Sequence, residues 1–211
     1  MEIAVRTEKP QDYREVEALT RSAFAYPERI ARGGIGCPYE HWMVHELRSR
    51  DGIPELSLVA EANGRIVGHI ICSKAVVRTD GGGEIPVLNF GPLSVLPALQ
   101  RRGVGKALVT AMIEKAKQRG YGAIVFFGRP EYYPQFGFEE AEKFGIRDRE
   151  GGSCPAFMAM ELIPGYLRRA QGGRYWESDI YDDDLNRESV KEFDRQFLHQ
   201  SETVKETPER K

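Results

Sequence analysis

The sequence has few cysteines, no long apolar run and almost no net charge, and each absence excludes a class of protein. Its 211 residues include three cysteines, Cys37, Cys72 and Cys154, which are widely spaced and form no C-x-x-C pair. This pattern indicates neither a disulfide framework nor a thiolate metal site. We therefore expect three buried, reduced thiols.

The other absences concern membranes, nucleic acids and secretion. No apolar run approaches the roughly 20 residues that a membrane span requires, so we expect no membrane partner. The formal net charge of −2 argues against a nucleic-acid partner. The first residues, MEIAVRTEKPQD, lack the apolar core of a secretion signal, which favours a cytoplasmic protein.

Alternating strand and helix signals along most of the chain predict a mixed α/β (α+β) fold. Helical spacing covers residues 10–24 and 38–50, and Asn63-Gly64 indicates a hairpin turn between two β-rich runs. A strand at residues 85–96 then leads through a glycine-containing turn into a helix. The run AIVFFG follows as a parallel neighbour of that strand.

The composition shifts near the end of the chain. ESDIYDDD is acidic, and the segment after it can form a helix with Val190, Phe193 and Phe197 on one side. These three residues cannot make a core of their own, so we divide the chain into a domain at 1–172 and an accessory tail at 173–211. We expect the tail to pack on the domain or on a second subunit as a homodimer, to fray at its end and to take no part in the chemistry.

The stretch QRRGVGKA, at residues 100–107, stands where the strand gives way to the helix. The first turn of a helix leaves backbone N–H groups without intrahelical partners, and glycine lets an anion approach them, so the stretch predicts a phosphate-binding turn. A Walker loop, G-x-x-x-x-G-K-[ST], would need glycine at position 100 and a hydroxyl residue at position 107, where this chain has Gln100 and Ala107. A dinucleotide fingerprint, G-x-G-x-x-G, would need a third glycine at position 108, where this chain has Leu108. Both are excluded.

The remaining pattern, Q-x-x-G-x-G preceded by GPLSVLP, resembles the GNAT superfamily of acetyl-CoA-dependent N-acetyltransferases. In that family the signature binds the pyrophosphate of coenzyme A through backbone amides. The match extends to Tyr133-x-x-Phe136-Gly137-Phe138, which is similar to the family's Y-x-x-x-G-F segment. The cofactor-binding residues that the resemblance implies are Leu93, Val95, Gln100, Arg101, Arg102, Gly103, Val104, Gly105 and Lys106.

The resemblance also implies a fold. It is a mixed, mainly antiparallel, splayed sheet of six to seven strands, flanked by helices on both faces and followed here by the helical tail. Its fourth and fifth strands part and admit the pantetheine arm of the cofactor. Pro92 gives an independent indication, because a residue without a backbone N–H inside an apolar run favours a bulge or a parting of strands near Gly91-Pro92.

The activity that the resemblance implies is transfer of an acetyl group from acetyl-CoA to a primary amine of a small molecule or peptide. The departing thiolate needs a proton. Tyr133 occupies the position of the family's proton-donating tyrosine, with Tyr132 as its alternate. The other interpretation of Tyr133 is an aromatic packing residue beside Phe136 and Phe138.

The base is harder to choose from the sequence. We name Glu131 and His41, and consider Asn89 and Glu40 beside them, although ordered water could deprotonate the amine without a protein base. His41 and His45 have a spacing that can bind zinc, but EHWMVHE lacks the H-E-x-x-H motif and a third ligand, so we expect no metal.

Cys72 is the candidate for a covalent intermediate, but nothing near it in the sequence would activate its thiol. We therefore expect direct attack by the amine rather than an acyl-enzyme. The alternative function is a non-catalytic acyl-CoA-binding sensor or scaffold module. We expect acceptor specificity to lie around residues 25–40 and in the late strands.

Overall fold

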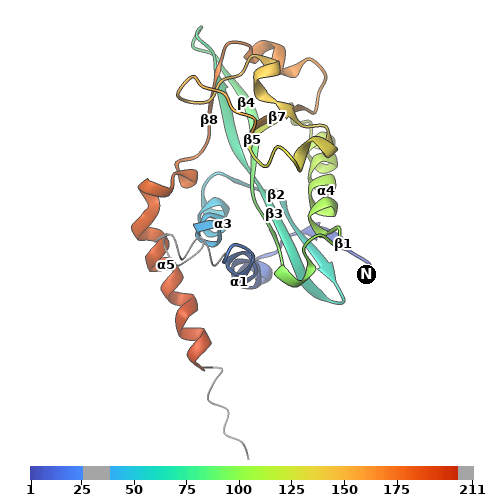
Figure 1. Cartoon of the computed structure of the whole chain (residues 1–211), viewed down its shortest axis with the longest axis vertical. Coiled ribbons are helices and arrows are strands. Elements are labelled where there is room, and N and C mark those ends of the chain that lie inside the picture. Colours follow the sequence, from blue (N-terminus) through green and yellow to red (C-terminus); the bar gives the residue numbers. More distant parts are fainter. Residues whose placement is uncertain (26–38, 204–211) are drawn as a thin grey trace, which may run out of the picture.

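The computed structural model describes residues 1–25 and 39–203, which form an α/β domain around one twisted eight-stranded sheet (Figure 1). The strands are β1 (Ala4–Thr7), β2 (Gly52–Ala62), β3 (Arg65–Arg78), β4 (Glu84–Val95), β5 (Ala123–Phe127), β6 (Glu139–Glu140), β7 (Phe157–Glu161) and β8 (Arg174–Trp176). The α-helices are α1 (Tyr13–Ala23), α3 (Tyr39–Ser49), α4 (Val104–Gln118) and α5 (Asp183–Thr203).

The sheet has the order β1-β2-β3-β4-β5-β7-β6, and β8 pairs with β3. Every pair is antiparallel except β4 with β5. This confirms a mixed, mainly antiparallel sheet, with eight strands where six to seven were expected. The short strands β6, with two residues, and β8, with three, are too brief to leave a periodic signal in the sequence.

Local turn chemistry explains where several elements begin and end. Asn63 and Gly64 have φ angles of 52° and 73° and close the β2–β3 hairpin, as the dipeptide predicts. Gly120 has a φ of 78° and lies just beyond α4, where a left-handed residue ends a helix. The following strand, β5, can therefore return beside β4.

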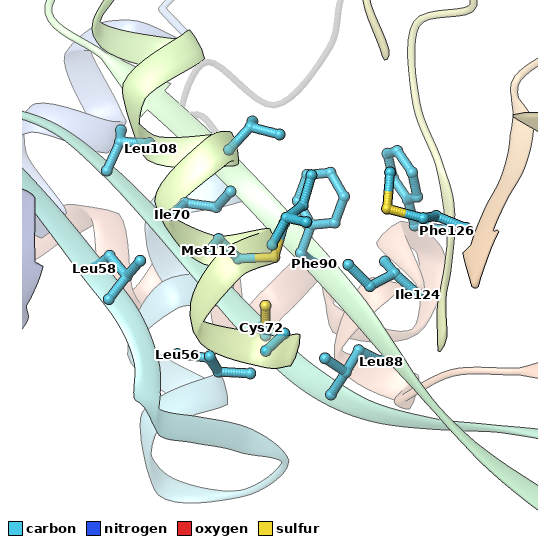
Figure 2. Packing of buried hydrophobic residues seen from close by; sticks show 14 of the residues in the cluster. Leu56, Leu58, Ile70, Cys72, Leu88, Phe90, Leu108, Met112, Ile124 and Phe126 are labelled. Atoms are coloured by element: carbon cyan, nitrogen blue, oxygen red, sulfur yellow. The ribbon is translucent and has the colours of Figure 1, made fainter. Parts of the chain in front are cut away.

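Helices cover both faces of the sheet (Figure 1). On one face α4 packs against strand residues that include Leu88, Phe90, Ile124 and Phe126, and its Met112 lies among them (Figure 2). We call this face the α4 face. The opposite face is covered by α1 and α3 at one end of the sheet, and at the other end by a cluster that includes Tyr175 of β8.

Strands β4 and β5 part soon after they meet. β4 follows β3 along most of its length, but its only register partner across the described part of β5 is the pair Leu88–Ile124. On the β3 side the partners Cys72–Phe90 and Ile70–Leu93 leave the two residues Gly91-Pro92 opposite Ile71, which is a β-bulge. The bulge and the parting of strands near Gly91-Pro92 are therefore confirmed.

The segment after Gly172 is joined to the rest of the chain in two ways. β8 extends the sheet beside β3, and α5 buries Val190, Phe193 and Phe197 in a cluster with residues of α1 and α3. The division of the chain at residue 172 and the homodimer stay predictions. Of the end expected to fray, residues 201–211, the first three belong to α5, and residues 204–211 lie outside the described residues.

The longest helix, α5, has 21 residues and is strongly charged. Among the described residues, no helix combines the length and the apolar character that crossing a membrane would need.

The cysteines differ from one another in burial. Cys72 is buried in the α4-face core, as expected, whereas Cys154 is exposed. The expectation of a buried thiol is wrong for Cys154 because this residue lies in the loop before β7 rather than in a strand. Cys37 lies outside the described residues.

The docking of α5 generates a stability prediction. Phe193 is 7% exposed, with ring centroids of His41 and His45 at 4.9 and 4.7 Å, so Phe193→Ala leaves a cavity between α3 and α5. We expect the free energy of unfolding to fall by about 3 kcal/mol in denaturant titrations. Leu185→Ala on the same helix, where the side chain is 65% exposed, should change it by less than about 0.5 kcal/mol. Equal effects of the two substitutions would show that α5 does not dock through Phe193.

Candidate active site

The connection from β4 to α4 leaves backbone N–H groups at the start of the helix without intrahelical acceptors. A 3-10 turn at Pro97–Leu99 is followed by Arg101 and Gly103, whose φ angles are 60° and 88°. These two left-handed residues turn the chain sharply into the helix. The first described hydrogen bond of the helix runs from the Ala107 N–H to the Gly103 carbonyl, at 2.9 Å.

The backbone N–H groups just before Ala107 are available to a ligand. Those of Val104, Gly105 and Lys106 belong to the first turn of α4 and have no intrahelical acceptor. The helix dipole makes this end locally positive, and the exposed side chains of Arg101, Arg102 and Lys106 add to that charge. The arrangement suits a phosphate group.

Gly105 is the point of closest approach in this turn. A Cβ atom at residue 105 would lie 3.1 Å from the Tyr132 Oη and 3.8 Å from side-chain carbons of Leu93 and Val95. Glycine therefore leaves room between α4, the end of β4 and the segment that carries Tyr132. The structure brings the two parts of the sequence motif together at this place. Gln100 lies at its entrance, with its Nε2 donating a hydrogen bond to the Val95 carbonyl at 3.4 Å.

Tyr133 lies beside the parting of β4 and β5. It begins a 3-10 turn at Tyr133–Phe136, and its ring packs edge-on against Phe126 and Phe90, with centroids at 4.8 and 5.5 Å. Burial raises the pKa of the Tyr133 hydroxyl well above its usual value, so the group stays protonated at neutral pH. The ring packing of the second interpretation is therefore present, and the role of Tyr133 as a general acid stays a prediction.

The predicted bases lie in different places. Glu131 is exposed in the turn before Tyr132. His41 is buried between α3 and α5, where its Nε2 lies 3.1 Å from Asp194 Oδ1 and its ring contacts Phe193 and Phe197. The structure does not bring His41 together with Tyr133.

Burial also decides the charge of His41. It lowers the pKa of the imidazole to about 4, against the opposing effect of Asp194, so the ring is neutral at physiological pH. Glu40, one residue earlier on α3, is half-buried. No group of three or more His, Cys, Asp or Glu side chains within residues 1–25 and 39–203 is placed to hold a metal ion.

Sequence reasoning missed an acidic side chain that reaches β4. Asn89 is buried, and its Nδ2 donates a hydrogen bond to Glu177 Oε2 at 2.7 Å. Glu177 follows β8, in the acidic stretch that looks like a solvated tail. The one available signal was the run RYW before it, which has the aromatic character of a strand.

A sheet in which two parallel strands part beside the bare start of a helix is the arrangement that the resemblance to acetyl-CoA-dependent acyltransferases implies. Comparison with known sequences agrees: the model of the acetyltransferase (GNAT) family matches residues 19–138. The chain belongs to this family, and it is an N-acetyltransferase by class.

Relatives and solved structures support this assignment. The chain is 31% identical over 169 residues to the uncharacterized N-acetyltransferase YhbS of Escherichia coli, an alignment that covers 80% of this chain and 92% of the relative. The crystal structure of E. coli YhbS in complex with CoA has a TM-score of 0.71 at 25% identity and covers 85% of this chain and 92% of that one. A GNAT family acetyltransferase from Brucella melitensis, in complex with acetyl-CoA, has a TM-score of 0.64 at 28% identity and covers 86% and 99%.

Proposed function

We propose that the protein transfers an acetyl group from acetyl-CoA to a primary amine of a small molecule or peptide, by direct attack of the amine. The observation that carries this proposal is the parting of β4 from β5, which opens between the start of α4 and Tyr133. The E. coli and B. melitensis structures, which hold CoA and acetyl-CoA, support the choice of cosubstrate.

The proposed cofactor-binding residues divide into a group for the pyrophosphate and a group for the pantetheine arm. The amides of residues 101–106 would hold the pyrophosphate, with Arg101, Arg102 and Lys106 adding positive charge around it. The edge of β4 at Leu93 and Val95 turns away from β5, so its backbone groups can pair with the extended pantetheine arm, as a sheet edge pairs with a peptide.

Tyr133 is the proposed general acid. The packing of its partly buried ring fixes the position of the hydroxyl, and its raised pKa keeps the proton available for the departing sulfur. Cys72 is fully buried and burial raises the pKa of its thiol, so it is a poor nucleophile and direct attack needs no acyl-enzyme. Tyr132, whose hydroxyl lies over Gly105, is the alternate acid.

The proposed acceptor is a primary amine of a small molecule or peptide. Of the loop expected to determine specificity, around residues 25–40, residues 26–38 lie outside the described residues. Glu131 keeps its place as a candidate base because it is exposed and near Tyr133 in the chain, whereas His41 is enclosed under α5. A cytoplasmic location is likewise part of the proposal.

The first prediction concerns the bare turn. Gly105→Val places a branched side chain against Tyr132, Leu93 and Val95, so coenzyme A affinity should fall by about 10-fold or more in calorimetric titrations. Gly81→Val is the matched control, because a Cβ atom there meets nothing within 4 Å. A folded Gly105→Val protein with the parent affinity would place the pyrophosphate elsewhere.

The second prediction concerns Tyr133→Phe, which keeps the ring and removes only the proton donor. Turnover should fall by about 10- to 1000-fold while coenzyme A affinity stays unchanged. The measurement is thiol release from acetyl-CoA across a panel of primary amines, with Tyr132→Phe measured in parallel to separate the two candidate acids. Unchanged turnover would leave Tyr133 as a packing residue, and no thiol release from the parent with any amine would favour the non-catalytic binding module.

A further inference from the structure

Side chains of β4 face both sides of the sheet where β4 parts from β5. Leu88 and Phe90 point to the α4 face, whereas Val87 belongs to the cluster on the opposite face. Asn89, between Leu88 and Phe90, must therefore point away from α4. The proposed cofactor site lies on the α4 face, where the Phe90, Phe126 and Tyr133 rings pack together, so the Asn89 face is the side left for an acceptor.

A carboxylate is held at this opening. Glu177 Oε2 accepts hydrogen bonds from the Asn89 Nδ2 at 2.7 Å and from the Tyr175 hydroxyl at 3.1 Å. Tyr175 is itself buried in the sheet cluster, so two fixed groups orient the acid. Glu177 forms no ion pair with any described residue, and the residue as a whole reaches the surface although its carboxylate is part-buried against Asn89 and Tyr175.

The segment that carries Glu177 also touches the bulge itself. The Tyr181 hydroxyl donates a hydrogen bond to the Gly91 carbonyl at 3.2 Å and lies 2.9 Å from Ser73 Oγ. Residues 175–181 are therefore fastened to β4 and β3 where β4 leaves β5.

The surroundings of Glu177 allow it to exchange a proton near neutral pH. Burial of the carboxyl group raises its pKa to about 7, and the hydrogen bonds from Tyr175 and Asn89 oppose this shift. The titratable groups that face it are the Tyr175 and Tyr181 hydroxyls, whose pKa values are raised by burial, so both stay neutral. The carboxylate would therefore gain from a cationic partner.

We propose that Glu177 binds the ammonium group of the acceptor and acts as its base, with Asn89 and Tyr175 as positioning residues. This inference rests on the proposed function. It assigns a part of the chemistry to the segment after residue 172, which the sequence pattern indicates to be an accessory tail.

The Glu177 carboxylate removes one proton from the ammonium group, and the freed nitrogen lone pair attacks the acetyl carbonyl carbon. A C–N bond forms and the C–S bond breaks. The sulfur keeps the bonding electron pair and takes the proton of Tyr133, and the second proton lost by the nitrogen restores the Tyr133 hydroxyl. Glu177 then releases its proton to solvent.

An exposed ring near Tyr175, the residue that orients this acid, indicates the class of acceptor. Phe127, the last residue of β5, is 46% exposed although it stacks on buried Phe157, at 4.7 Å between centroids. Its centroid lies 6.3 Å from that of Tyr175, the residue that orients Glu177. An apolar surface beside a carboxylate fits a primary amine carried on an apolar or aromatic body.

The test uses Glu177→Gln in the full chain, with 2-phenylethylamine as the probe. The amide keeps the shape of the side chain and can accept the Asn89 hydrogen bond, but it cannot remove a proton. We expect kcat/KM for the amine to fall by about 100-fold or more and its affinity for the CoA-loaded protein to fall by about 10-fold, with coenzyme A affinity unchanged. The matched control is Glu188→Gln on α5, an exposed side chain that pairs with Lys191.

The pH profile gives a readout that a structural role would not move. In the parent, kcat/KM should rise with pH through about 7, because the base must be ionised, and Glu177→Gln should lose this limb. Tyr175→Phe removes a hydrogen bond that stabilises the carboxylate, so it should move the limb to higher pH.

Each outcome decides a different point. Parent-like kinetics and pH dependence of folded Glu177→Gln would overturn the role of Glu177. A parent that turns over ethylamine as well as 2-phenylethylamine would overturn the apolar acceptor class. A parent that binds no coenzyme A, or releases no thiol with any amine, would instead overturn the proposed function.

Discussion

The site depends on one strand that is paired fully on one side and barely on the other. β4 follows β3 through the bulge at Gly91-Pro92, but its one ladder pair with β5 in the described part of the chain is Leu88–Ile124. Beyond that pair no described strand bonds the facing backbone groups of β4, and leaving such groups without hydrogen bonds is costly. Pro92 offers no N–H, so the bulge cannot simply close against β5. An extended ligand that supplies hydrogen bonds is the natural partner for this edge.

The bulge also determines which side chains face α4. One extra residue shifts the alternation, so Leu88 and Phe90 before the bulge and Leu93 and Val95 after it all pack on the α4 face. Without the bulge, Leu93 and Val95 would point away from Gly105, to which they are now close. The same insertion that parts the strands therefore keeps the apolar wall of the proposed cofactor site continuous.

The sequence predicts what is local and misses what is distant. Pro92, the Asn63-Gly64 turn and the glycines before α4 act through their own backbone conformation, so they can be recognised without a structure. His41 lies on an amphipathic helix whose partner, α5, begins more than a hundred residues later, so nothing near it indicates burial. Glu177 is one of several acids in its stretch, and only the pairing of β8 with β3 brings this one to Asn89. Periodicity carries no information about such long-range contacts.

The docking of α5 and the proposed acceptor face are parts of one arrangement. Tyr39 of α3 donates hydrogen bonds to the carbonyls of Ile180 and Asp182, the latter at 3.0 Å, and so holds the turn between β8 and α5. Behind it, Arg21 bonds Asp194 at 2.6 Å on the buried side of α5. β8 fastens the segment from one end and α5 from the other, and Glu177 lies between them. A carboxylate on a free tail would lose much of its effect to conformational averaging, whereas one fixed at both ends can meet the amine in a single geometry. The tail thus has a reason to dock even though it adds little core of its own.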